Sequence, residues 1–126
     1  GQRLSLVDDG GVGPAHPWDR SPVPAEHQIR GLGPITMSVP ELTRTDLVLQ
    51  RVLGFRPVRT YAHPERARDT VHVYEMGAGG AGAELHVAVQ PDLAVGRQGA
   101  GAVHHVAFRA AAAPGPNPPR RAACDA

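Results

Sequence analysis

Two stretches of this sequence carry side chains that could bind a metal ion, a glutamate with a histidine in one and two histidines in the other. Glu84 and His86 lie two residues apart in "AELHVAVQ", and His104 and His105 are adjacent in "AVHHVAFR". Neutral imidazole and carboxylate groups suit a divalent first-row metal ion. Because successive side chains of a strand point to opposite faces, Glu84 and His86 would share a face. By the same rule, only one of His104 and His105 could enter a given cavity. His72, in the run "TVHVYEM", could approach His86 from a neighbouring strand.

Composition excludes several other chemistries. The chain of 126 residues has a net charge of +1, which favours neither nucleic acid nor an anionic membrane as a partner. All 13 basic residues are arginine, so this chain supplies neither a Schiff-base lysine nor a P-loop lysine. The single cysteine can form neither an internal disulfide nor a cysteine-rich zinc site, so a cytoplasmic location is expected. No apolar run reaches the roughly 20 residues of a membrane span.

Apolar periodicity places these residues on a small set of expected elements. Alternating runs predict strands at 3–7, 32–39, 55–61, 70–76, 84–90 and 102–109. Between them we expect a Pro- and Gly-rich connector at 8–31, a polar loop at 62–69 and a turn at 77–83. From residue 110 onward no periodicity remains, which predicts a disordered tail.

One helix is expected, at 42–53. Val48, Leu49, Val52 and Leu53 form one apolar stripe at helical spacing. Glu41 or Thr43 could cap its start. Gly54 would end it, because glycine enters the left-handed backbone region without a steric penalty.

The predicted order of elements and two motifs resemble a known family. "HPWDRSPVPAEHQIRGLG" (16–33) is similar to the segment that joins the two halves of hydroquinone-type ring-cleaving dioxygenases, and "GRQGAGAVHHVAFR" (96–109) is similar to the entry to their last module. The β-α-β-β-β order, with "VLGF" ending the helix, resembles the vicinal oxygen chelate superfamily, which includes glyoxalase I and bleomycin-resistance proteins. The resemblance covers residues 3–109.

This resemblance implies an α+β fold. A βαβββ module would have a flanking strand on each side and disordered tails. Residues 1–31 would hold the end strand of a preceding module and a linker. Residues 32–109 would hold the module and the first strand of the next one, and residues 110–126 the tail. The same likeness suggests a truncated or frame-shifted member, holding about one of the family's four modules.

The resemblance also implies a metal. The family binds non-haem Fe(II) with two histidines and a glutamate, and the second histidine of its "HH" pair falls on His105. His86 falls on the position that carries an acidic ligand in many modules of this fold, with Glu84 on the same face. The matching first ligand would fall at Gly33, which has no side chain. A degenerate or structural role for His86 and Glu84 is therefore the favoured interpretation, with a metal site as the alternative.

Two functions from different classes follow. The first is a fragment of an Fe(II)-dependent extradiol-type ring-cleaving dioxygenase for hydroquinone- or catechol-like diols, inactive alone. The second is a non-catalytic glyoxalase-fold module for binding or dimerisation. An uncovered apolar sheet face predicts a homodimer in either case. Trp18 in the linker could bury its ring and so anchor the segment, or it could lie at an active-site rim together with His16 and His27. We favour the anchoring role.

Overall fold

The structure is a computed structural model that describes residues 3–13, 15–94, 96–97, 99, 103 and 105–108. The chain divides into two compact units. One unit is Leu6–Val95, and the other combines Gly1–Ser5 with Gly96–Ala126. The predicted tail at 110–126 lies outside the described residues.

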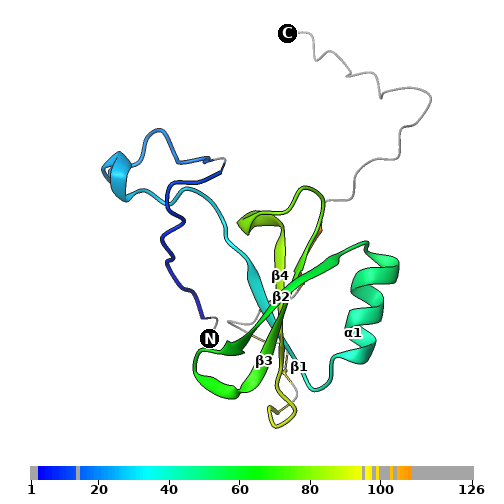
Figure 1. The fold of residues 1–126 in the computed structure, drawn as a ribbon. Coiled ribbons are helices and arrows are strands. Elements are labelled where there is room, and N and C mark those ends of the chain that lie inside the picture. The colour runs from blue at the N-terminus through cyan, green and yellow to red at the C-terminus, as the bar shows by residue number, and fades with distance from the viewer. Residues whose placement is uncertain are drawn as a thin grey trace, which may run out of the picture. The chain divides into compact units, whose positions relative to one another are not determined.

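The larger unit contains a four-stranded mixed sheet and one short helical segment (Figure 1). The strands are β1 (Ile35–Val39), β2 (Arg56–His63), β3 (Arg66–Glu75) and β4 (Glu84–Val89). Their order across the sheet is β1-β4-β3-β2, with β1 parallel to β4 and the other two pairs antiparallel. The helical segment lies between β1 and β2 in the chain, so the fold is α+β and has the predicted order of elements.

The helix starts as an α-helix and finishes as a π-helix. It consists of α1 (Thr43–Leu47) and η2 (Val48–Val52). The Glu41 carboxylate accepts hydrogen bonds from the Thr43 and Arg44 amides, which satisfies amide groups that have no partner within the helix. The helix ends before Gly54, whose φ of 71° is the left-handed conformation expected of a glycine stop.

The helix packs on one face of the sheet and forms the core there. This core contains Leu49 of the helix, Tyr74, Leu85 and Val87 of the sheet, and Val39 and Phe55. The Tyr74 hydroxyl donates a hydrogen bond to the Asp46 carboxylate at 2.7 Å, which links β3 to the helix. Burial and this hydrogen bond raise the pKa of Tyr74 well above its usual range.

The predicted apolar stripe of the helix is only partly correct. Leu49 is buried, whereas Val48, Val52 and Leu53 remain 45%, 71% and 38% exposed. In a π-helix, hydrogen bonds join residues five apart, and Val48 accepts such a bond from the Leu53 amide. Of the four residues of the predicted stripe, only Leu49 therefore belongs to the core.

Two strand boundaries differ from the sequence-based expectation. Residues 62–69 do not form a loop, because β2 continues to His63 and β3 begins at Arg66, with only a two-residue turn between them. Ala62 pairs with Thr70, and His63 pairs with Arg66. These pairs form between backbone groups, so the polar side chains of the segment do not prevent strand formation. The tight hairpin positions the charged residues of β3 on the sheet.

The two flanking strands are not found among the described residues. Residues 3–7 lie outside any strand, and so do residue 103 and residues 105–108. The prediction of strands at 3–7 and 102–109 was therefore wrong for the residues that are described.

Candidate functional site

The sheet face opposite the helix carries a continuous chain of polar side chains. Strand register decides which residues share this face, because paired residues of neighbouring strands point the same way. His86 pairs with Val73, Val73 pairs with Arg59, and Val71 pairs with Tyr61. Tyr74 and Leu85, which pack on the helix, alternate with these residues and point to the other side.

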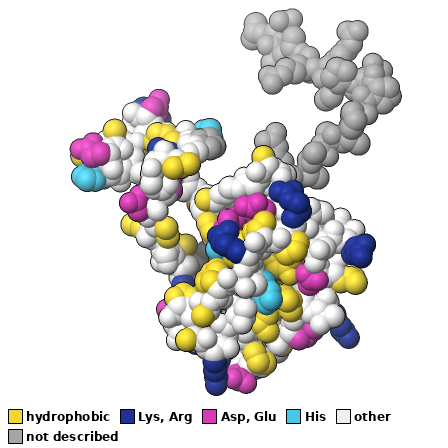
Figure 2. Space-filling model, viewed as in Figure 1, with side chains coloured by type: hydrophobic (Ala, Val, Ile, Leu, Met, Phe, Trp, Pro, Cys, Tyr) yellow, Lys and Arg dark blue, Asp and Glu magenta, His cyan; other side chains and the backbone are white. Residues whose placement is uncertain are grey.

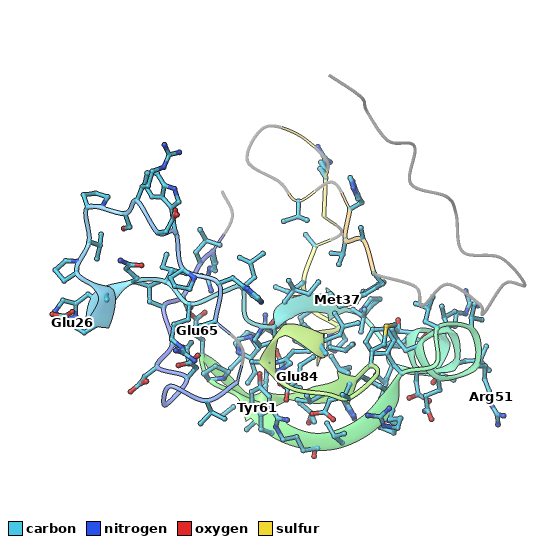
Figure 3. All side chains as sticks on the ribbon, turned by 90° about the horizontal axis from the view of Figure 1, so that it is seen from above. Glu26, Met37, Arg51, Tyr61, Glu65 and Glu84 are labelled. Carbon is cyan, nitrogen blue, oxygen red and sulfur yellow. The ribbon has the colours of Figure 1, made fainter. Side chains whose placement is uncertain are left out.

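Four side chains of this face form what we call the relay: Arg59, Glu84, His86 and Tyr61. Two guanidinium nitrogens of Arg59 donate to the two Glu84 oxygens at 2.7 and 2.8 Å. Glu84 Oε2 lies 2.8 Å from His86 Nε2, and His86 Nδ1 lies 2.9 Å from the Tyr61 hydroxyl. The Tyr61 and His86 rings also meet edge to face. Figure 3 shows Tyr61 and Glu84 close together on the sheet, away from the helix that carries Arg51.

The electrostatics of the relay fix its protonation. The Arg59 hydrogen bond, assisted by His86, lowers the pKa of Glu84 to about 2, although burial opposes this shift. The Glu84 hydrogen bond in turn raises the pKa of Arg59 above its usual range. Burial raises the pKa of Tyr61. Glu84 is therefore an anion and Tyr61 a neutral phenol at ordinary pH.

These charges also fix the direction of the hydrogen bonds. A carboxylate only accepts, so His86 Nε2 must donate its proton to Glu84. When the imidazole is neutral, its other nitrogen is an acceptor, and the Tyr61 hydroxyl then donates to His86 Nδ1. A carboxylate that orients an imidazole, which in turn holds a hydroxyl, is the arrangement used for proton transfer in hydrolytic triads. Here it binds β2 to β4 across the intervening strand β3.

The relay does not fit a metal ion as it stands. Both nitrogens of His86 and both oxygens of Glu84 already have hydrogen-bond partners. Within the described ranges, no group of three His, Cys, Asp or Glu side chains is close enough to hold a metal. His72 does not join the group as expected, because it pairs with Val87 and so points to the helix side of the sheet. Of the sequence candidates, the structure brings together Glu84 and His86.

His105 belongs to the smaller unit. It is exposed there and lies outside any strand. The adjacent His104 lies outside the described residues.

Residues of the linker take no part in the relay. Trp18 is 59% exposed, so the prediction that it anchors the linker by burial was wrong. His27 lies in a short 3-10 helix, Ala25–His27, and is exposed. A surface ion pair between Arg30 and Asp9 joins the two ends of the linker instead.

A second polar cluster lies at the other end of the same sheet face. Ser38 donates to the Gln90 side chain at 2.6 Å, and Gln90 donates to the Asp69 carboxylate at 3.1 Å. Arg66 Nε lies 2.7 Å from Asp69, whose side chain is 4% exposed. Arg68 pairs with Asp92 at 2.7 Å on the surface. This cluster ties β1, β3 and the end of β4 together.

Sequence reasoning missed Arg59, Tyr61 and Gln90. Arg59 and Tyr61 are two residues apart in a predicted strand, so their shared face could have been recognised, but not their alignment with Glu84 and His86. That alignment depends on the order of strands in the sheet and on the irregularity in pairing between Pro57 and Arg59. Gln90 is not part of any recognisable sequence motif.

Comparison with known proteins identifies a relative. Over 110 residues, 86% of this chain, the sequence is 43% identical to the curated Bacillus subtilis (strain 168) protein named "Putative ring-cleaving dioxygenase MhqA". The chain belongs to the vicinal oxygen chelate superfamily. It spans 34% of the length of this relative. No family model and no solved structure matches the chain.

The small mixed sheet with one short helix is compatible with a glyoxalase-type module of this superfamily. None of the helices that the structure describes is long and apolar enough to cross a membrane. Within this fold, the relay lies on the face of the sheet opposite the helix, beside the buried Val71 and Val73.

Proposed function

We propose that this chain is part of an Fe(II)-dependent, extradiol-type ring-cleaving dioxygenase for hydroquinone- or catechol-like diols, and that it acts in the cytoplasm. The observation that carries the proposal is the 43% identity to a protein named as a ring-cleaving dioxygenase across 86% of the chain. The iron is proposed for the whole enzyme, because the described residues do not fit a metal site. His105 is proposed as the ligand that this chain contributes.

The relay supports a structural role for the module in such an enzyme. Its groups satisfy one another rather than present free ligands, and they join β2 to β4 on the face opposite the helix. A sheet face with fixed charges can position a neighbouring part of the protein without taking part in the reaction.

The experiment is a chimera in which this chain replaces the matching 110 residues of the MhqA relative. We expect the chimera to consume oxygen when given a hydroquinone and Fe(II). The substitution His105→Ala should lower that rate by about 100-fold or more, since loss of a metal ligand removes the metal's contribution to the reaction. His27→Ala, which changes an exposed linker histidine, is the matched control and should leave the rate nearly unchanged.

Iron content separates the proposal from its alternatives. The chain alone should retain little Fe(II) after dialysis, because it supplies one expected ligand. If the chain alone bound stoichiometric iron and His105→Ala abolished that binding, the proposal that its metal site is incomplete would be contradicted. Iron that disappears on His86→Ala would place the metal at the relay instead.

The second candidate function is a non-catalytic module that binds another chain or dimerises. Exposed apolar side chains on the two edge strands favour it: Ile35 and Met37 of β1 and Val58 of β2 are 38%, 38% and 44% exposed. Figure 2 shows hydrophobic side chains among charged ones on the visible face of the sheet-and-helix region. The face opposite the helix carries the relay beside apolar side chains, because Val71 and Val73 of β3 point to it and are 1% and 0% exposed.

We therefore expect self-association of the isolated chain. Edge strands with unpaired backbone groups and exposed apolar side chains favour pairing with a second copy. Light scattering across a dilution series should give a molar mass that falls toward that of a monomer only at low concentration. A constant monomer mass together with a cooperative thermal melt would show that the edges need no partner.

A further inference from the structure

The Tyr61 end of the relay has the geometry for the coupled loss of one electron and one proton. The Tyr61 hydroxyl lies 2.9 Å from His86 Nδ1, and His86 Nε2 lies 2.8 Å from the Glu84 carboxylate. When the imidazole is neutral, the phenol donates its hydrogen bond to it. A phenol that has lost an electron is a very strong acid, so its oxidation is easiest when a base is already in place to take the proton. An imidazole at hydrogen-bond distance is such a base, because it binds a proton near neutral pH.

We infer that Tyr61 is a redox-active tyrosine, which gives one electron to a strong oxidant and its hydroxyl proton to His86 in a single step. The O–H bond of Tyr61 breaks and an N–H bond forms at His86 Nδ1. The products are a neutral tyrosyl radical and an imidazolium. The electron goes to a one-electron oxidant of the class of nitrogen dioxide, which becomes nitrite.

The other two members of the relay keep the transferred proton on His86. The Glu84 anion beside Nε2 stabilises the imidazolium, as a carboxylate does in a hydrolytic triad. The hydrogen bonds from Arg59 lower the pKa of Glu84 to about 2, so this carboxylate does not take the proton further. Burial raises the pKa of Tyr61, so the phenol keeps its proton until the electron leaves. The proton therefore stays beside Tyr61 and can return when the radical is reduced.

The second tyrosine of the chain provides an internal comparison. The Tyr74 hydroxyl also donates a hydrogen bond, but its acceptor is the Asp46 carboxylate at 2.7 Å. That bond lowers the pKa of Asp46, which makes the carboxylate a poor proton acceptor. Tyr74 is 1% exposed, whereas Tyr61 is 37% exposed and can be reached by an oxidant. We therefore assign the oxidation to Tyr61, and this inference is independent of the proposed dioxygenase activity because no proposed iron ligand takes part.

The test is flash oxidation of the full chain by photogenerated ruthenium(III) tris-bipyridine, with the tyrosyl radical detected by transient absorption and electron paramagnetic resonance. The chain carries Trp18→Phe and Cys124→Ser, which remove the single tryptophan and the single cysteine as competing electron donors. We expect Tyr61→Phe to slow radical formation by about tenfold or more, and Tyr74→Phe to leave the rate nearly unchanged. With His86 present, the rate should not depend on buffer concentration, because the proton is transferred within the protein.

His86→Gln separates proton acceptance from hydrogen bonding. The glutamine amide oxygen can still accept a hydrogen bond from Tyr61, but an amide does not take up the proton. We expect this variant to form the radical about tenfold more slowly or less, at a rate that rises with the concentration of buffer base. His72→Gln is the matched control, since His72 lies on the adjacent strand and points to the helix side of the sheet. It should leave the rate unchanged.

Three results would overturn the inference. They are a radical located on Tyr74, equal rates for His86→Gln and the chain that retains His86, and a rate that depends on buffer concentration while His86 is present. If His86→Gln does not fold, the location of the radical and its buffer dependence decide, because both are measured with His86 in place.

Discussion

Leu85→Ala is expected to lower the free energy of unfolding by about 2–5 kcal/mol, the range for removing a large buried aliphatic side chain. Leu85 is 2% exposed and lies in the core that joins the sheet to the helix. It is flanked across the sheet by Ile35 on β1 and by Tyr74 on β3. The shortened side chain would leave a cavity that these neighbours cannot fully close. Urea denaturation monitored by circular dichroism measures the change.

Leu47→Ala provides the matched control. Leu47 is the same residue type in α1 but is 59% exposed, so its truncation leaves no cavity. Surface substitutions of this kind usually change stability by less than about 0.5 kcal/mol. If Leu85→Ala and Leu47→Ala lost similar amounts of unfolding free energy, the helix would not cover the sheet at Leu85.

Acid is expected to destabilise the chain through Glu84. Its pKa is lowered from 4.5 to about 2 in the folded state, so the folded protein binds the proton less readily than the unfolded chain. Glu84 therefore contributes stability above about pH 4.5, and that contribution is lost as the pH falls through this value toward 2. We expect a loss of about 1–2 kcal/mol across this interval, well below the full pKa difference, because solvent screens the half-exposed Arg59 partner.

Comparison with Glu84→Gln isolates this contribution, because other carboxylates with lowered pKa values, such as Asp46, are unchanged. The variant should be less stable than the unmodified chain at pH 7, and the difference between the two should vanish near pH 2. Glu75 lies on β3, on the same face of the sheet as Glu84, so Glu75→Gln is the control. Its free energy of unfolding should differ less from that of the unmodified chain. An unfolding free-energy difference for Glu84→Gln that does not vary between pH 7 and pH 2 would contradict the relay geometry. Chemical denaturation at each pH provides the measurement.

Local sequence patterns determined most of the fold. Alternation of apolar residues located β1, β4 and the second half of β3, because the period of two places every second side chain on one face whatever the neighbours are. Gly54 marked the end of the helix for an equally local reason, since its φ of 71° disfavours other residues. Glu84 and His86 were placed on a common face by the same rule. The likeness to ring-cleaving dioxygenases also rests on sequence, and the 43% identity to one such protein supports it.

Tertiary structure decided what those residues contact. Arg59 lies 25 positions from Glu84 in the chain, and Tyr61 lies 25 positions from His86, so no local pattern could pair them. The order β1-β4-β3-β2 brings their strands onto one face, and the shift in register after Pro57 sets which residues align. His72 was separated from His86 for the same reason, although the two lie on adjacent strands. Sequence therefore identified candidate metal ligands, whereas the sheet paired them with an arginine and a tyrosine that occupy their binding atoms.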